Sequence, residues 1–189
     1  MTKAMLGMKV AALVANGFEE KQFIKAQRSF IEMGATLKII STNQGLVNGW
    51  EGQAWGHNFA VDASLNTALG VDYAGLLIPG GQRSIEKLKS TAHTKRFIGS
   101  FMAAHKPVAV MGDALSLMIM SEQIDGRTVA GPVAMRDEAI KMGAKWSEEP
   151  MMIDNAMLTG IADLDNMDMF IEMMQDVFTN NMMMDQEAA

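Results

Sequence analysis

Three short stretches of the sequence bring together side chains and backbone groups that could support chemistry. They are NGFEEKQ with Glu19 and Gln22, PGGQRS with Gly80 and Gly81, and GDALS with Gly112, Asp113 and Ser116. Carboxylates act as general acids and bases, glycine-loop amides stabilise developing negative charge, and an activated serine is a nucleophile. These three stretches are therefore the candidate functional segments.

Several kinds of chemistry are excluded or disfavoured by residue type. The chain has no cysteine, which excludes disulfides, thiolate metal sites and a cysteine nucleophile. His57, His93 and His105 lack metal-ligand spacing, so we predict neither a metal nor a cofactor. A nucleophilic Ser116 would need a base, and no histidine is near it in sequence. A serine on a helix usually bonds its own backbone, and we favour that interpretation.

The elements that must position these stretches alternate along the chain. Apolar runs typical of buried strands occur at 9–15, 35–42, 73–79, 106–112 and 149–160, and the segment 45–63 suggests a hairpin. Helical patterns occupy 19–34, 91–105, 113–121, 134–144 and the region from Met167 to Phe178. This alternation predicts an α/β fold with a mostly parallel sheet and helices on both faces. Because ligands bind at the carboxyl ends of such strands, the three stretches should meet at one edge.

Composition limits the partners and the compartment. A net charge of −6 and a pI near 5.0 argue against nucleic acid and anionic membranes as partners. No segment has the run of about 18 apolar residues that a membrane span needs, and residues 9–15 read as a strand rather than a targeting signal. We predict a cytoplasmic protein with one domain over 1–180 and a flexible, methionine-rich tail over 181–189.

Methionine is unusually abundant, at 20 residues, and half of these fall in 151–189. A copper(I) or oxidant-scavenging surface is one interpretation. We favour the other, in which methionine fills a core and a dimer face. Trp50 and Trp55 likewise have two open interpretations: they line a pocket or subunit contact, or they form a core patch under the hairpin.

An ordered set of motifs resembles a known family. VANGFEEKQF, VNGWEGQAWGHNFAVDASL, DYAGLLIPGG, KPVAVMG and GRTVAGPVAMRDEAIKMGAKW follow the order and spacing of the DJ-1/PfpI (ThiJ) superfamily, over about Met8 to Phe178. The resemblance implies a flavodoxin-like, class I glutamine amidotransferase-like sandwich that usually forms dimers. Active members resemble cysteine hydrolases or act on reactive oxoaldehydes.

The same resemblance shows what this chain lacks. Active members place a cysteine, commonly followed by histidine, at the turn after the KPVA strand, where this chain has Gly112 and Asp113. The carboxylate that contacts the cysteine is replaced by Gln22, whereas Glu19 and the oxyanion-type loop Gly80-Gly81 remain. We expect Asp113 to cap the helix that it begins. The Gly-Asp-Ala turn is similar to that of the non-catalytic C-terminal domain of large-subunit catalases.

The sequence therefore predicts a catalytically silent family member, a homodimer that binds a small molecule or acts as a structural or interaction module. The predicted ligand-binding residues are Glu19, Gln22, Gly80, Gly81, Gly112 and Asp113. The alternative is a hydrolase or lyase with altered chemistry, in which Glu19 or Asp113 is the general base.

Overall fold

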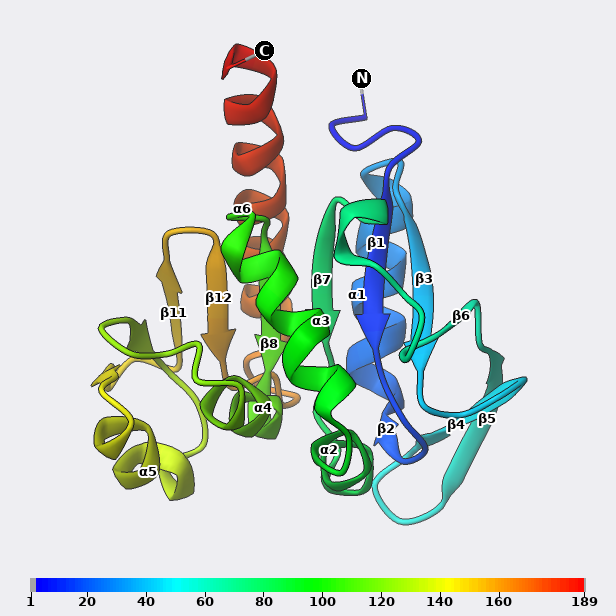
Figure 1. Ribbon diagram of the computed structural model, residues 1–189, viewed down its shortest axis with the longest axis horizontal. Helices are drawn as coiled ribbons and strands as arrows, with labels where there is room; N and C mark the ends of the chain where they lie inside the picture. Colours follow the sequence, from blue (N-terminus) through cyan, green and yellow to red (C-terminus); the bar gives the residue numbers. More distant parts are fainter. Residues whose placement is uncertain (1–2, 189) are drawn as a thin grey trace.

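A seven-stranded sheet forms the centre of the protein, and helices lie against both of its faces (Figure 1). The computed structural model describes residues 3–188. The strand order is β11-β12-β8-β7-β1-β3-β6, and every neighbouring pair is parallel except β11 with β12. The predicted fold class, a mostly parallel sheet between two helical layers, is confirmed.

The elements follow the alternation expected from the sequence. The strands of the central sheet are β1 (Lys9–Leu13), β3 (Thr36–Ser41), β6 (Ala63–Ser64), β7 (Gly75–Ile78), β8 (Val108–Met111), β11 (Met151–Asp154) and β12 (Met157–Gly160). The smaller sheets contain β2 (Phe18–Glu19), β4 (Leu46–Trp50) and β5 (Trp55–Ala60), and separately β9 (Thr128–Val129) and β10 (Lys145–Trp146). The α-helices are α1 (Glu20–Glu32), α2 (Gln82–Lys89), α3 (Ala92–Ala103), α4 (Leu115–Met120), α5 (Arg136–Lys141) and α6 (Met167–Ala188).

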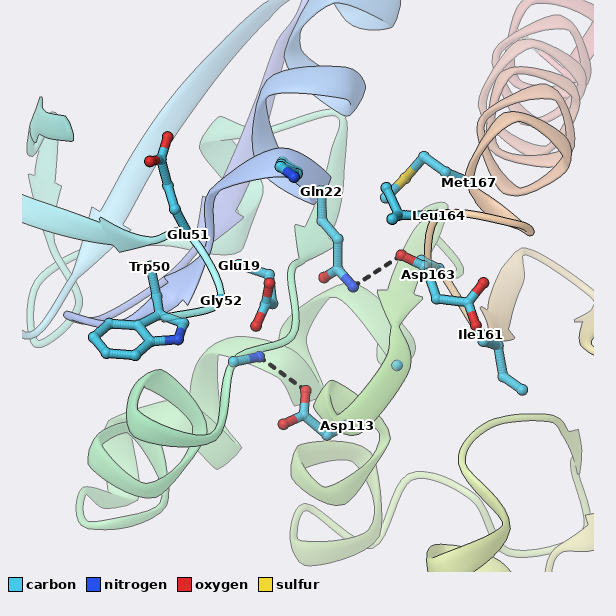
Figure 2. A pocket seen from close by; sticks show the side chains of 14 residues that line it. Glu19, Gln22, Trp50, Glu51, Gly52, Asp113, Ile161, Asp163, Leu164 and Met167 are labelled. Atoms are coloured by element: carbon cyan, nitrogen blue, oxygen red, sulfur yellow. Dashed lines mark hydrogen bonds between the residues drawn. The ribbon is translucent and has the colours of Figure 1, made fainter. Parts of the chain in front are cut away.

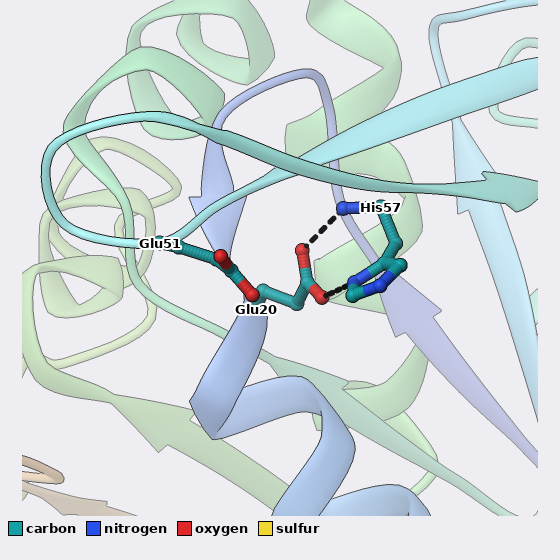
Figure 3. A group of neighbouring side chains, drawn as sticks. All are labelled: Glu20, Glu51 and His57. Carbon is teal, nitrogen blue, oxygen red and sulfur yellow. Dashed lines mark hydrogen bonds and ion pairs between the residues drawn. The ribbon is translucent and has the colours of Figure 1, made fainter.

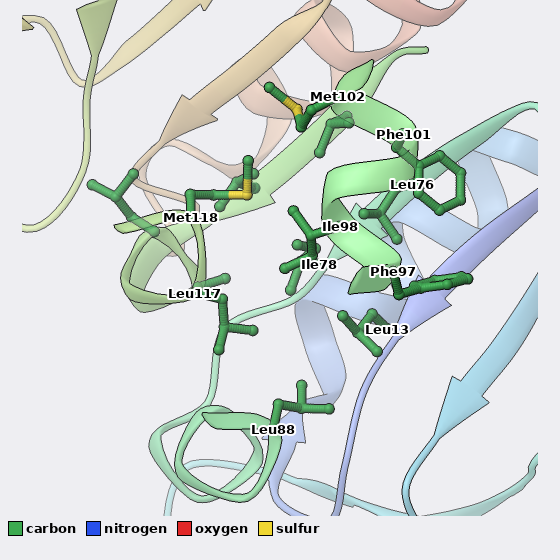
Figure 4. Close-up of a cluster of buried hydrophobic side chains, with 14 of the residues drawn as sticks. Leu13, Leu76, Ile78, Leu88, Phe97, Ile98, Phe101, Met102, Leu117 and Met118 are labelled. Carbon is green, nitrogen blue, oxygen red and sulfur yellow. The ribbon is translucent and has the colours of Figure 1, made fainter. Parts of the chain in front are cut away.

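Two hydrophobic cores lie on opposite faces of the sheet because successive strand residues point to opposite sides. In β1, Ala11 and Leu13 belong to one core, and Val10 and Ala12 to the other. The first core packs against α2, α3 and α4, and its aromatic and aliphatic side chains interlock in Figure 4. The second packs against α1 and α6, where the rings of Phe30 and Phe178 meet edge to face at 4.9 Å. Burial on both faces explains why the central strands are almost uninterrupted apolar runs.

The methionines of the C-terminal region divide between core and surface. Half of the ten are buried, namely Met151, Met157, Met167, Met174 and Met182. Met183 and Met184 are exposed in the last turns of α6, which continues to Ala188. Methionine therefore fills core space, as favoured from the sequence. The predicted domain boundary at 180 and the mobility of the tail remain predictions.

Candidate functional site

The three candidate stretches meet at one edge of the sheet. They follow β1, β7 and β8, which are adjacent parallel strands, so their carboxyl ends open onto the same side. A pocket of about 390 Å³ lies there, bordered also by the β4–β5 hairpin and the loop after β12 (Figure 2). Of the six predicted site residues, Glu19, Gln22, Gly81, Gly112 and Asp113 line this pocket. Gly80 lies next to it and takes part through its backbone.

The turn after β8 has room for a side chain that it does not carry. Gly112 begins a 3-10 turn, Gly112–Ala114, and has a φ of +56°. A Cβ built on it would have only the Gln22 Nε2 atom within 4 Å, at 3.8 Å. The backbone is thus held in the left-handed conformation that L residues adopt only under strain. The turn thus has space for a side chain beside the pocket, and glycine occupies the position.

Gln22 and Asp113 hold the glycine loop from opposite sides. The Gly80 amide donates to Gln22 Oε1 at 2.8 Å, and the Gly81 amide donates to Asp113 Oδ1 at 2.9 Å. Gln22 Nε2 donates in turn to the Ala162 carbonyl at 3.1 Å (Figure 2). The glycine loop is present, but both of its amides are already bonded to side chains of the protein. Neither is directed at a position where a ligand oxyanion would sit.

The expected role of Asp113 as the cap of its own helix is wrong. No side chain caps the 3-10 turn or α4, because Asp113 lies inside the turn rather than before it. Its carboxylate instead reaches across the pocket to Gly81, which is the N-cap residue of α2. An acidic group is still stabilised by a helix N-terminus, but the helix is a different one.

The acidic groups of the pocket influence each other. Glu19 is half-buried, and its pKa is raised, first by burial and then by the neighbouring Asp113 carboxylate, with Lys21 opposing. Asp163 adds a third acidic side chain to the lining, and Lys21 is the single basic residue among the described residues that line it. The pocket is thus strongly acidic.

The two tryptophans pack against each other at the edge of the pocket and do not form a buried core patch. Their rings meet edge to face at 5.3 Å, and the guanidinium of Arg83 lies 4.7 Å from the ring centre of Trp50. Trp50 lines the pocket, whereas Trp55 is 52% exposed. Of the two open interpretations, the structure supports the pocket wall for Trp50.

A buried glutamate that the sequence analysis did not single out anchors the hairpin. Glu20 is 1% exposed and accepts two hydrogen bonds from His57, one from the backbone amide at 2.8 Å and one at Nδ1 at 2.5 Å (Figure 3). Glu51 completes a group whose possible ligand atoms lie within 4.8 Å of one another, a spacing that a divalent cation could bridge. The hydrogen bonds already satisfy the Glu20 carboxylate. We therefore interpret the Glu20–His57 pair as a structural contact that joins α1 to β5, and we call this pair the latch. Glu20 and His57 are 37 positions apart in the chain, so no local pattern in the sequence indicated this contact.

This latch predicts a pH dependence of stability. The pKa of His57 is raised, first by its hydrogen bond to Glu20 and then by the charge of Glu20. A folded-state pKa above the unfolded value of about 6.5 stabilises the protein fully below that value. The contribution is lost as pH rises through the folded pKa. Urea unfolding midpoints should fall over this window in the wild type, and His57→Gln should remove that component. An identical pH profile in both proteins would contradict the latch.

Ser116 does not lie at the pocket. Its side chain is buried, and its hydroxyl has no hydrogen-bond partner within the described residues. The expected bond to its own backbone is therefore absent. His93 and His105 lie elsewhere, at the start of α3 and before β8. Nothing in this geometry activates Ser116 as a nucleophile.

Comparisons of the sequence with known proteins find relatives over most of its length. General stress protein 18 of Bacillus subtilis is 29% identical over 149 residues, which cover 78% of this chain and 84% of that protein. Deglycase PfpI of Pyrococcus furiosus is 24% identical over 147 residues, covering 78% and 86%.

Solved structures give the same result for the fold. DJ-1 of Schizosaccharomyces pombe superposes with a TM-score of 0.74 at 17% identity, over 94% of this chain and 97% of its own. A two-domain protein of Anabaena variabilis, with DJ-1/ThiJ/PfpI-like and ferritin-like domains, superposes with a TM-score of 0.81 at 20% identity. That match covers 89% of this chain but only 47% of the two-domain protein. The model of the DJ-1/PfpI family matches residues 8–176, and the chain belongs to this family.

Proposed function

We propose that this protein is a catalytically silent member of the DJ-1/PfpI family that binds a small molecule in the pocket beside Gly112. One observation carries the proposal: the turn where active relatives are expected to hold a nucleophile is a glycine, in a chain without cysteine. The bonds of Gln22 and Asp113 to the glycine loop support it, because they occupy both amides that would otherwise stabilise an oxyanion.

The names of the relatives suggest a setting for this function. One relative is named a general stress protein and another a deglycase. A thiol-dependent activity cannot be carried over to a chain without cysteine, whereas a role in stress responses can. We therefore propose a stress-related binding or interaction protein.

An enzyme with altered chemistry is the second candidate, and the raised pKa of Glu19 favours it. A carboxylate whose pKa is closer to neutral is a better general base or acid than an ordinary one. In this candidate Glu19 or Asp113 would exchange a proton with a bound carbonyl compound. Neither Gly112 nor the bonded amides of the glycine loop would assist that step.

A turnover assay separates the two candidates. Wild-type protein is incubated with methylglyoxal, beside the double variant Glu19→Gln, Asp113→Asn and a boiled sample. For the silent protein we expect consumption at the rate of the boiled sample in both. Turnover by the wild type that the double variant loses would overturn the proposal and favour the second candidate.

A gain-of-function variant serves as the control for that assay. Gly112→Cys with Gln22→Glu restores the thiol and the carboxylate that the family resemblance implies, and the Cβ meets no clash. Alkylation of its single thiol by iodoacetamide would show that the turn can present a nucleophile. The wild type, lacking any cysteine, should not be labelled.

Assembly and location complete the proposal. We propose a homodimer, as family members commonly are, and a cytoplasmic location. Among the described residues, no helix is both long and apolar enough to cross a membrane. Native mass spectrometry of wild type and Gln22→Ala would report the subunit number together with any ligand that co-purifies. A monomer would contradict the first of these proposals.

A further inference from the structure

We propose that the pocket beside Gly112 takes an organic cation, an ammonium or guanidinium group carried on a small apolar body. This inference rests on the proposed ligand-binding function and names its ligand class. It follows from which polar groups of the pocket remain available to a ligand, and from where its apolar side chains lie.

Three hydrogen-bond donors of the glycine loop and of Gln22 are already used within the protein. The amides of Gly80 and Gly81 donate to Gln22 and Asp113, and the side-chain amide of Gln22 donates to the Ala162 carbonyl. An anionic or carbonyl ligand that took its hydrogen bonds from these three donors would have to break bonds that the protein already makes. Leaving a buried donor or acceptor without a partner is unfavourable, so a ligand that displaces these bonds is disfavoured.

The acceptors, in contrast, are in excess. Three acidic residues whose side chains face the pocket, Glu19, Asp113 and Asp163, line it together with one basic residue, Lys21. The Glu19 and Asp113 side chains point toward the same part of the pocket (Figure 2). One oxygen of the Asp113 carboxylate, Oδ1, already accepts the hydrogen bond of the Gly81 amide. A ligand cation between these two groups would relieve their mutual repulsion and form charge-assisted hydrogen bonds.

The opposite side of the pocket suits an apolar body. Ile161, Leu164 and Met167 line it there, away from Trp50 (Figure 2). Leu164 is 82% exposed, so a ligand chain lying against it would remove apolar surface from water. The volume of about 390 Å³ fits a compact amine or guanidine rather than a polymer.

Three probes of nearly equal shape test the ligand class. The full-length protein is titrated calorimetrically with butylguanidinium, with its neutral counterpart butylurea, and with pentanoate. We expect butylguanidinium to bind at least about tenfold more tightly than butylurea, and pentanoate not to bind. The affinity for butylguanidinium should fall with added salt, since the attraction is electrostatic.

Isosteric variants assign the binding to the two carboxylates. Glu19→Gln and Asp113→Asn should each weaken butylguanidinium binding about tenfold, the size expected for losing a charged hydrogen bond. Asp113→Asn keeps an oxygen for the Gly81 amide, so the loop stays bonded. Glu172→Gln on α6, which removes one negative charge outside the pocket, is the matched control and should bind like the wild type.

The outcomes separate the inference from the function on which it rests. If butylurea or pentanoate bound more tightly than butylguanidinium, and Asp113→Asn abolished that binding, the cation class would be overturned. The pocket would still be a ligand-binding site. Failure of butylguanidinium to bind at millimolar concentration, or equal weakening by Glu172→Gln, would also overturn the inference. Failure of the proposed function would instead be seen in the turnover assay, as consumption of methylglyoxal that requires Glu19 and Asp113.

Discussion

Replacing Gly81 with alanine is expected to lower the free energy of unfolding by about 3–5 kcal/mol, the sum of backbone strain and a steric clash. Gly81 has a φ of +120°, which L residues rarely adopt. A Cβ there would lie 2.4 Å from the Gly17 carbonyl oxygen and 2.8 Å from the Phe18 Cα. These are backbone atoms of the loop after β1, which cannot move aside without displacing Glu19. Chemical denaturation of the purified variant measures the effect.

Gly112→Ala is the matched control for this prediction. It has a φ of +56°, but its Cβ would meet nothing closer than the Gln22 Nε2 atom at 3.8 Å. Only the cost of the left-handed conformation remains, about 1–2 kcal/mol. Equal losses in the two variants would mean that close packing of the glycine loop against the first loop does not contribute.

Glu20→Ala is expected to lower the free energy of unfolding by about 3 kcal/mol, because two charge-assisted hydrogen bonds are lost together. The His57 backbone amide would lose its acceptor, and a void would open between α1 and the β4–β5 hairpin. Gly49 and Gly56 border the carboxylate so closely that a Cβ on either would lie within 2.5 Å of Glu20 Oε2. The hairpin is thus shaped around this side chain. Relative to the wild type, hydrogen exchange in Glu20→Ala should accelerate more in β5 than in β1.

Glu19→Ala is the control for the loss at Glu20. It is the preceding residue and also a glutamate, but it is half-buried at the pocket, and its carboxylate has no hydrogen-bond or ion-pair partner among the described residues. We expect it to change stability by less than about 1 kcal/mol. A loss at Glu19 equal to that at Glu20 would contradict the latch. Unchanged exchange of β5 in Glu20→Ala would contradict it as well.

Much of the fold was predictable because local patterns and the global sheet agree. Apolar runs such as KVAAL and VAVM can be buried only in a strand covered on both faces, and amphipathic segments between them can only be the covering helices. The position of the site followed from the same rule, since three loops at the carboxyl ends of adjacent strands must meet. The absence of a cysteine nucleophile was also evident from the sequence, because it depends only on residue type.

The hydrogen bonds of the site were not predictable. The Asp113 carboxylate could accept a hydrogen bond either at the start of its own helix or at the start of α2. The choice depends on the orientation of a 3-10 turn that sequence spacing does not specify. The role of Gln22 depends likewise on the distance between α1, the glycine loop and the loop after β12. Glu20 and His57 met only because the hairpin folds back over α1.

The sequence by itself determined the fold class, the edge of the sheet where the three candidate loops meet, and the absence of a thiol. Periodicity and residue type carry that information, and both are local. Only the tertiary structure decided which groups of the pocket remain free for a ligand. A hydrogen bond requires two atoms about 3 Å apart, and residues such as Gln22 and Ala162, 140 positions apart in the chain, reach that distance only once the sheet has assembled.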